Sequence, residues 1–216
     1  MYDERSDLGR YGLWLTLAWV GGGAFLVSAL TVDAAWMRAM DGAVIGWLEG
    51  HRVAGLTAVA RETTALANAT TLVLIALVAA VLLDAHHRRR LSLLPLAAMV
   101  VAIGVNYLAK ALFGRDRPQL LEWLTHAGHH AFPSGHALYA AAGFITLAFS
   151  LGCVTTVPWI RWAVWIVAVG LVLAVGLSRV YLGVHWPSDV LGGWGLGCAV
   201  AGAAIAVAGK WSSVEG

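Results

Sequence analysis

Long apolar segments recur along this chain and limit it to one kind of fold. An α-helix needs about 20 residues to cross the hydrocarbon core of a bilayer, and six stretches of the sequence are apolar over roughly that length. We therefore predict an all-α integral-membrane bundle of six transmembrane helices. The predicted spans are Tyr11–Val32, Ala65–Ala85, Leu91–Phe113, Ser134–Cys153, Ile160–Arg179 and Asp189–Gly209.

The composition favours a membrane protein over a soluble one. Hydrophobic residues make up 60% of the 216 residues and charged residues only 12%, whereas soluble globular domains carry about 25% charged residues. The formal net charge of +2 is small and its charges are scattered, which argues against a nucleic-acid partner. No linker or low-complexity tract divides the sequence. We therefore expect one membrane domain over residues 1–216, with its core motifs at residues 110–189.

The segment Asp33–Thr64, between the first two spans, is neither fully apolar nor typical of a loop. Apolar side chains recur in it at helical spacing, with charged side chains among the remaining positions. The apolar positions are Met37, Met40, Val44, Trp47 and Leu48, and the charged ones are Arg38, Asp41, Glu49 and Arg52. This pattern predicts an amphipathic helix lying in the membrane interface. An ordinary helical connection packed on the bundle is the alternative.

Three short polar stretches interrupt the apolar background: residues 110–118 (KALFGRDRP), 133–136 (PSGH) and 178–189 (SRVYLGVHWPSD). They lie where the third span ends, where the fourth begins, and where the fifth ends and the sixth begins. Because consecutive spans cross the membrane in opposite directions, all of these ends must meet at one membrane face. The sequence therefore brings the polar residues together by topology alone.

The orientation of the bundle follows from the basic residues 86–90 (HHRRR), between the second and third spans. Cytoplasmic loops are enriched in Lys and Arg, so this cluster is expected in the cytoplasm together with both termini. The three polar stretches then lie on the extracytoplasmic face.

Three cations in these stretches are suited to holding a phosphate. Lys110 offers a point charge, and Arg117 and Arg179 each offer a planar fork that can bind two phosphate oxygens. Cations near a bilayer core are costly without an anionic partner. The alternative for any one of them is a structural ion pair or a side chain whose charged end reaches the interface.

The PSGH stretch adds backbone donors to this anion site. Pro133 suits the first turn of a helix, which leaves the N–H groups of Ser134, Gly135 and His136 at the helix N-terminus, facing an anion. Gly135 also allows the backbone to approach closely.

Two histidines and a carboxylate supply groups that could attack the bound phosphate. His185 and Asp189 are four residues apart, with Pro187 between them at a predicted helix start. The carboxylate can hold one imidazole nitrogen and leave the other facing the phosphate. His136 is then suited to donate a proton to the departing oxygen. A helix-start hydrogen bond is the structural alternative for the His185–Asp189 pair.

The combined pattern Lys-x6-Arg-Pro, Pro-Ser-Gly-His and Ser-Arg-x5-His-x3-Asp resembles the type 2 phosphatidic acid phosphatase (PAP2) superfamily, in its membrane lipid phosphatase branch. The resemblance implies a phosphatase that needs no metal or other cofactor and works through a phosphohistidine on His185, assisted by Asp189. It implies that His136 is the proton donor. It also implies that phosphate is bound by Lys110, Arg117, Ser134, Gly135 and Arg179.

The resemblance and the span layout together suggest a lipid substrate at a membrane face. Undecaprenyl diphosphate is the favoured substrate, and phosphatidylglycerophosphate and phosphatidic acid are alternatives. The related vanadate-dependent haloperoxidases share the motifs but are soluble, which the composition disfavours. Two functions without hydrolysis are also considered. A transporter of anionic lipids would not need the His185–Asp189 pair, and a catalytically inactive membrane scaffold would not need buried cations, so the sequence disfavours both.

Several other residues suggest weaker hypotheses. The histidines of one loop, with Glu122, could hold a metal or form a solvated rim of the site; they are His126, His129 and His130. Asp116 is expected to pair with Arg115. Asn106 is expected either to orient Lys110 or to bond to another helix. Gly193 and Gly197 predict close helix packing in the sixth span.

Overall fold

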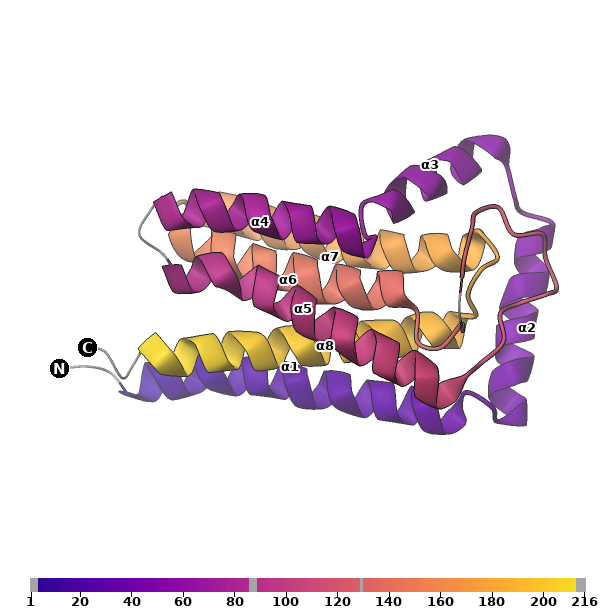
Figure 1. The fold of residues 1–216 in the computed structure, drawn as a ribbon, viewed down its shortest axis with the longest axis horizontal. Helices are drawn as coiled ribbons and strands as arrows, with labels where there is room; N and C mark the ends of the chain where they lie inside the picture. The colour runs from indigo at the N-terminus through magenta and orange to yellow at the C-terminus, as the bar shows by residue number, and fades with distance from the viewer. Residues whose placement is uncertain (1–3, 86–88, 129, 213–216) are drawn as a thin grey trace.

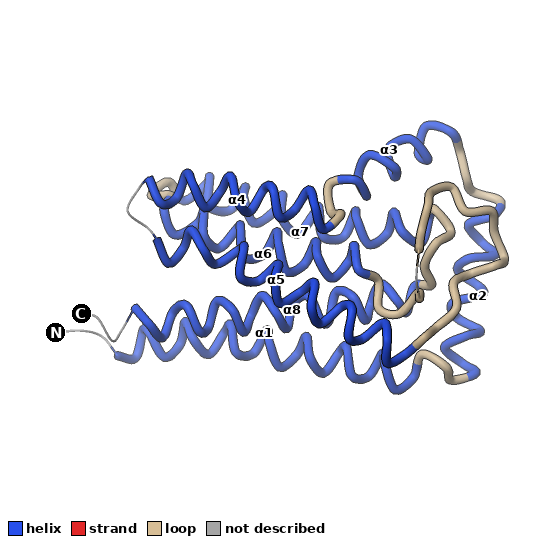
Figure 2. The backbone as a smooth tube through the Cα atoms, viewed as in Figure 1, coloured by secondary structure: helices blue, strands red, loops and turns tan. Residues whose placement is uncertain are grey.

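The structure, a computed structural model, describes residues 4–85, 89–128 and 130–212. Within these residues the chain forms eight helices joined by loops (Figures 1 and 2). They are α1 (Glu4–Thr31), α2 (Ala35–Glu49), α3 (Ala54–Ala65), α4 (Ala69–Ala85), α5 (Arg89–Phe113), α6 (Gly135–Val154), α7 (Pro158–Tyr181) and α8 (Pro187–Ser212). The predicted all-α membrane bundle is confirmed.

The number of membrane spans depends on how the second one is counted. Among the described residues, five helices are long and apolar enough to cross a bilayer, and these are α1, α5, α6, α7 and α8. The pair α3 and α4 also qualifies when taken together, although it is bent by 54° at its break. The helix that carries most of the predicted second span, α4, begins at Ala69 rather than at Ala65.

Asn68 accounts for this break. Its side-chain oxygen accepts a hydrogen bond from the Thr71 backbone N–H at 2.7 Å, the usual way in which Asn starts a helix. The Asn68 amide also donates to the Ala65 carbonyl at 3.1 Å, at the end of α3. One side chain therefore ends one helix and begins the next.

The segment expected to form one amphipathic helix forms two, α2 and α3. Helix α2 lies across one end of the bundle, roughly at right angles to the spans (Figure 1). It turns Met37, Asp41 and Ile45 inward and leaves Met40 and Trp47 exposed. Asp41 was assigned to the polar face, yet it is fully buried, at 0% exposure. A buried carboxylate needs charged or hydrogen-bonding partners, and Asp41 has them in the site described below.

Helix α6 lies at the centre of the bundle and is packed by α5, α7 and α8. The predicted close packing at Gly193 and Gly197 of α8 is confirmed. A Cβ atom added at Gly193 would lie 2.5 Å from the Ser134 carbonyl oxygen, and one at Gly197 would lie 2.5 Å from the Leu138 carbonyl oxygen. These glycines let α8 approach the start of α6 closely enough for the two helices to share a site.

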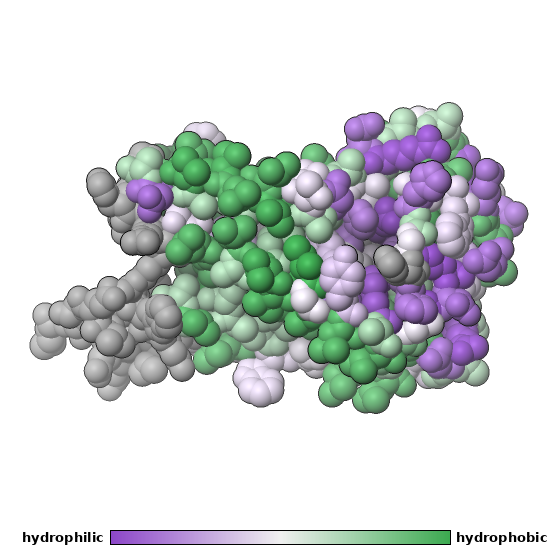
Figure 3. All heavy atoms as spheres, in the orientation of Figure 1, coloured by the Kyte–Doolittle hydropathy of each residue, from purple (hydrophilic) through white to green (hydrophobic). Residues whose placement is uncertain are grey.

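The surface divides into two parts along the length of the bundle. On the face drawn in Figure 3, apolar side chains cover the middle of the bundle and polar side chains gather at the end that carries α2 and α3. The start of α1 and the end of α8 lie toward the opposite end (Figure 1). The basic residues 86–88 lie outside the described residues.

Candidate active site

Four helix ends meet beside α2, at the polar end of the bundle (Figures 1 and 2). They are the last turns of α5 and α7 and the first turns of α6 and α8. The backbone joins two of them directly, because the Ser134 N–H donates to the Asp189 carbonyl oxygen at 2.9 Å. The three polar stretches of the sequence are thus brought to one end of the bundle, as their topology predicted.

His185 and Asp189 form the predicted pair. His185 lies in the loop between α7 and α8 and is 2% exposed, and Asp189 lies in the first turn of α8 and is 0% exposed. The Nδ1 atom of His185 is 3.3 Å from Asp189 Oδ2. The same carboxylate oxygen accepts the Trp186 backbone N–H at 2.9 Å. Asp189 is therefore held by the helix start as well as by the histidine.

Arg117 fixes the tautomer of His185. Its guanidinium Nη1 lies 3.1 Å from His185 Nε2, and a guanidinium can only donate. Nε2 is therefore the acceptor, and Nδ1 carries the proton that points to Asp189. This is the tautomer in which the Nε2 lone pair is available to a reacting atom.

Burial lowers the pKa of His185 well below its ordinary value, and the positive charges of Arg117, Arg179 and Lys110 lower it further. A depressed histidine pKa means that the imidazole stays neutral until the pH falls below the usual titration range.

This shift predicts how His185 responds to pH. Because its pKa lies below the ordinary value of about 6.5, His185 should remain neutral between roughly pH 8 and pH 6.5. Nitrogen NMR of histidine-labelled protein in detergent measures this directly, with His185 assigned by the loss of its signals in the His185→Asn protein. Titration of His185 at or above pH 6.5 (about the ordinary value) would contradict the expectation.

The predicted phosphate-binding cations lie around this pair. Lys110 Nζ and Arg117 Nη2 both donate to the His130 carbonyl oxygen, at 2.5 Å and 3.4 Å. Arg179, in the last turn of α7, is only 3% exposed, and its Nη1 donates to Thr64 Oγ1 at 3.1 Å. Its Nε atom is buried and has no hydrogen-bond partner among the described residues.

The start of α6 brings its own polar groups to the same place. Ser134 caps the helix and is 0% exposed, yet its hydroxyl has no hydrogen-bond partner among the described residues. The Ser134 N–H was expected to face an anion, and it instead bonds to Asp189, as described above. The N–H groups of Gly135 and His136 come first in the helix, where an α-helix offers no carbonyl partner.

His136, in the first turn of α6, completes the convergence. It is half-buried and lies within electrostatic reach of His185, Arg117, Arg179 and Lys110. The structure thus brings together all of the residues that the motifs predicted, from four different helix ends.

Three side chains at the site are not marked by any pattern in the sequence. Arg115 Nη1 donates to Asp189 Oδ1 at 2.5 Å, and its Nη2 donates to Asp41 Oδ2 at 2.8 Å. Thr64, at the end of α3, holds Arg179. These contacts join residues 74 and 115 positions apart, and no local sequence pattern marks pairs at such separations.

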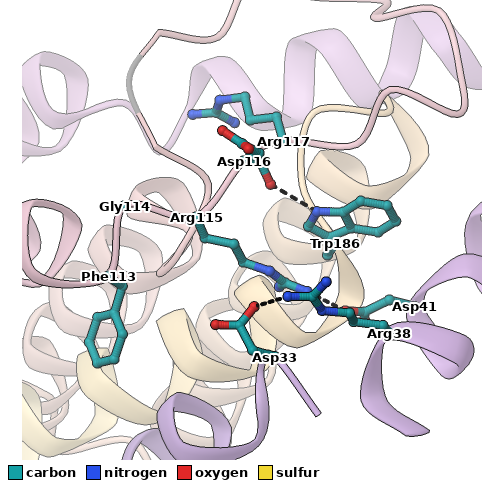
Figure 4. A pocket seen from close by; sticks show the side chains of 9 residues that line it. All are labelled: Asp33, Arg38, Asp41, Phe113, Gly114, Arg115, Asp116, Arg117 and Trp186. Carbon is teal, nitrogen blue, oxygen red and sulfur yellow. Dashed lines mark hydrogen bonds and ion pairs between the residues drawn. The ribbon is translucent and has the colours of Figure 1, made fainter. Parts of the chain in front are cut away.

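The expectation that Asp116 pairs with Arg115 is wrong. The Asp116 side chain is exposed, and its backbone carbonyl accepts the Trp186 indole N–H at 3.0 Å. Arg115 instead extends past Trp186 toward Asp41, within a pocket of about 500 Å³ (Figure 4). The pocket is lined by Asp33, Arg38, Asp41, Phe113, Gly114, Arg115, Asp116, Arg117 and Trp186.

Asn106 bonds to another helix rather than to Lys110. Its amide donates to the Tyr139 hydroxyl at 2.7 Å, which joins α5 to α6. A Cβ atom at Gly135 would lie 3.3 Å from this amide, so Asn106 also packs against the start of α6. Among the described residues no three His, Cys, Asp or Glu side chains gather as a metal site. His129, part of the loop considered for a metal, lies outside those residues.

Comparison with known proteins places this arrangement in a family. A sequence model of the PAP2 superfamily matches residues 91–213. An undecaprenyl-diphosphatase of Sulfolobus acidocaldarius is 34% identical over 127 residues, which cover 56% of each chain. A phosphatidylglycerophosphatase B of Bacillus subtilis is 40% identical over 96 residues, which cover 43% of this chain and 46% of that one. The matches thus span about half the length of these curated relatives.

Solved structures agree over more of the chain. The crystal structure of a transmembrane PAP2-type phosphatidylglycerolphosphate phosphatase from Bacillus subtilis matches with a TM-score of 0.80 and 26% identity, covering 89% of this chain and 94% of that one. The Aquifex aeolicus LpxE structure shares the fold, with a TM-score of 0.53 and 21% identity over 74% of this chain and 92% of that one. Because the family match covers more than half of the sequence, this multi-pass membrane protein belongs to the PAP2 superfamily.

Proposed function

We propose that this protein is a lipid phosphatase that removes the terminal phosphate of a lipid phosphate or diphosphate, with undecaprenyl diphosphate as the best candidate substrate. The observation that carries the proposal is the environment of His185. A neutral imidazole, oriented by Asp189, keeps its Nε2 lone pair toward Arg117, one of several cations in the site. A neutral imidazole with a free lone pair, surrounded by cations, is suited to attack an anionic phosphate.

Phosphate binding is the first step. The incoming phosphate takes over the hydrogen bonds of the cations, so Arg117 turns from His185 Nε2 to a phosphate oxygen. Arg179 offers its unpartnered Nε, and Ser134 offers its unpartnered hydroxyl. The N–H groups of Gly135 and His136 add the favourable field of a helix N-terminus. Each of these buried donors then gains the partner that burial requires.

Transfer of the phosphoryl group follows. His185 Nε2 forms a bond to phosphorus while the bond from phosphorus to the leaving oxygen breaks. His136 gives its proton to that oxygen, and the lipid leaves as an alcohol or, from a diphosphate, as a lipid monophosphate. The cations stabilise the negative charge that is spread over the transferred oxygens.

Hydrolysis restores the enzyme. Water attacks the phosphorus of the phosphohistidine, the bond from phosphorus to Nε2 breaks, and His136 accepts the proton that the water loses. Inorganic phosphate leaves, and the neutral imidazole returns to its contacts with Asp189 and Arg117. Asp189 stabilises the positive charge on the imidazole while phosphorus is bound to it.

The lipid substrate is supported by where the site lies. The catalytic groups sit at the polar end of an apolar bundle, so a charged headgroup can reach them while its hydrocarbon tail stays in the bilayer (Figure 3). The named activity of the Sulfolobus acidocaldarius relative supports a prenyl diphosphate. That of the Bacillus subtilis relatives favours phosphatidylglycerophosphate as the second candidate. We place the site on the extracytoplasmic face because residues 86–90 are basic.

A phosphate-release panel with purified protein in detergent tests the proposal. The substrates are undecaprenyl diphosphate, phosphatidylglycerophosphate and phosphatidic acid, each assayed with and without a chelator. We expect release from all or some of them without added metal, with the highest kcat/KM for undecaprenyl diphosphate. No release from any lipid would contradict hydrolysis and favour binding or transport. A higher kcat/KM for phosphatidylglycerophosphate would replace the proposed substrate with the second candidate.

A further inference from the structure

We propose that Asp41 and Arg115 are positioning residues for phosphoryl transfer, through which helix α2 sets the geometry of the His185–Asp189 pair. The inference rests on the proposed function, because it assigns these two residues a role in the attack by His185. Asp41 lies outside the three polar stretches of the sequence. Arg115 lies in the first of them, residues 110–118, but has no role in the proposed mechanism. Arg115 bonds to the Asp189 oxygen that does not face His185, and Asp41 bonds to Arg115.

Arg115 links two buried carboxylates. Its Nη1 donates to Asp189 Oδ1 at 2.5 Å and to Ser188 Oγ at 2.8 Å. Its Nη2 donates to Asp41 Oδ2 at 2.8 Å. The Arg115 side chain is 9% exposed and the two carboxylates are 1% and 0% exposed. A planar guanidinium with both ends occupied has one orientation, which is the property required of a positioning group.

Asp41 fixes that orientation and the start of α8 at the same time. Its Oδ1 accepts the Ser188 backbone N–H at 3.0 Å, and its Oδ2 accepts the Ser188 hydroxyl at 2.5 Å as well as Arg115. Ser188 immediately precedes Asp189. One carboxylate of α2 therefore holds the backbone beside Asp189 and the cation that binds the Asp189 side chain.

The contacts of Asp189 show why this matters for His185. Oδ2 of Asp189 faces the His185 Nδ1 atom and accepts the Trp186 N–H, and Oδ1 is bound by Arg115. Arg115 thus determines the rotation of the carboxylate about its own axis. Without it, the Trp186 N–H is the one remaining donor among the described residues that directs Oδ2 toward the imidazole, and small errors in such geometry reduce rates strongly.

The first experiment compares Asp41→Asn with Glu49→Gln, in the full-length protein with the best lipid of the panel. Both changes convert a carboxylate of α2 into its amide, but Glu49 is exposed. We expect Asp41→Asn to lower kcat roughly 10- to 100-fold with KM changed less than about threefold, since the lost contacts act on the reacting pair rather than on substrate binding. Glu49→Gln should keep normal kcat. An Asp41→Asn protein with normal kcat would overturn the inference.

A double-mutant cycle separates positioning from general stability. If Asp41 acts through Asp189, the Asp41→Asn/Asp189→Asn protein should turn over within about threefold of Asp189→Asn alone. If Asp41 merely supports the fold, the two losses should multiply in the double variant, which would overturn the inference. Thermal unfolding of each variant in detergent shows how much folded protein each assay contains.

Chemical rescue provides a second variant in case Asp41→Asn folds poorly. Arg115 borders the pocket of about 500 Å³ that Asp41 and Trp186 also line (Figure 4), so a small cation can reach its place. We expect millimolar guanidinium to raise the kcat of Arg115→Ala at least fivefold, and sodium at the same ionic strength to leave it unchanged. An Arg115→Ala protein with normal kcat would overturn the inference.

These outcomes remain distinct from a failure of the proposed function. Normal turnover in both His185→Asn and Asp189→Asn would refute the proposed mechanism itself. Loss of turnover in those two variants, together with normal turnover in Asp41→Asn, would refute only the positioning role.

Discussion

Replacing His185 by asparagine should lower kcat for phosphate release by at least about 10⁴-fold, as loss of a covalent nucleophile does in other hydrolases. Asparagine fills part of the same buried space and can still bond to Asp189 and Arg117. It has no imidazole lone pair to form a bond with phosphorus. The proposed phosphate-binding cations remain, so the protein should still bind inorganic phosphate or vanadate. Stopped phosphate-release assays in detergent measure the loss.

His51→Asn is the matched control for this variant. His51 follows α2, is exposed, and stacks on Trp47 with ring centroids 4.0 Å apart. The same chemical change at His51 should leave kcat within about twofold, as surface substitutions usually do. If His185→Asn kept more than a tenth of normal turnover, a histidine nucleophile at this position would be excluded.

The second large effect is expected at Arg179. Changing it to alanine should lower kcat/KM by roughly 10²- to 10⁵-fold, the range found when one donor or arginine that stabilises transition-state charge is removed. Arg179 is buried, Thr64 holds one end of its guanidinium, and its Nε is left for a ligand. The kcat/KM of Arg179→Lys should lie between those of the unchanged protein and Arg179→Ala, because lysine keeps the charge but loses the planar fork.

Arg161 offers a control on the same helix. It lies near the start of α7, far from the site, where it donates to the Thr155 carbonyl at 2.9 Å. Arg161→Ala should therefore leave kcat/KM near normal. Equal losses in Arg161→Ala and Arg179→Ala would mean that the charge of α7 matters only for folding or insertion, and the phosphate-binding role of Arg179 would be rejected.

The membrane bundle and the convergence of the motifs could be predicted because both depend on local or topological features. A span is marked by a continuous apolar run. Because consecutive spans cross the membrane in opposite directions, the order of a span along the chain fixes the face on which it ends. His185 and Asp189 are only four residues apart, on either side of a predicted helix start at Pro187, so their contact could be expected from their spacing. The close packing of α8 could also be predicted, because Gly193 and Gly197 are four residues apart and therefore lie on one face of the helix.

The missed features depend on contacts between distant residues. Asp41 has the sequence neighbours of a surface carboxylate, and only the fold brings Arg115 and Ser188 to it, from 74 and 147 positions further along the chain. The break between α3 and α4 was missed for a different reason. Ala65 and Leu66 continue the apolar character of the span, and the capping bonds of Asn68 override it.

Trapping the covalent intermediate tests the central claim most directly. The His136→Gln protein, mixed with a lipid diphosphate carrying a labelled terminal phosphate and quenched in alkali, should retain the label. Glutamine cannot accept the proton of the attacking water, which delays hydrolysis, whereas a lipid monophosphate is a good leaving group and departs without a proton from residue 136. Phosphohistidine survives alkali and is lost in acid. We predict label on the peptide that contains His185, and none in the His185→Asn protein. Turnover without any labelled protein, or label on another residue, would contradict attack by His185.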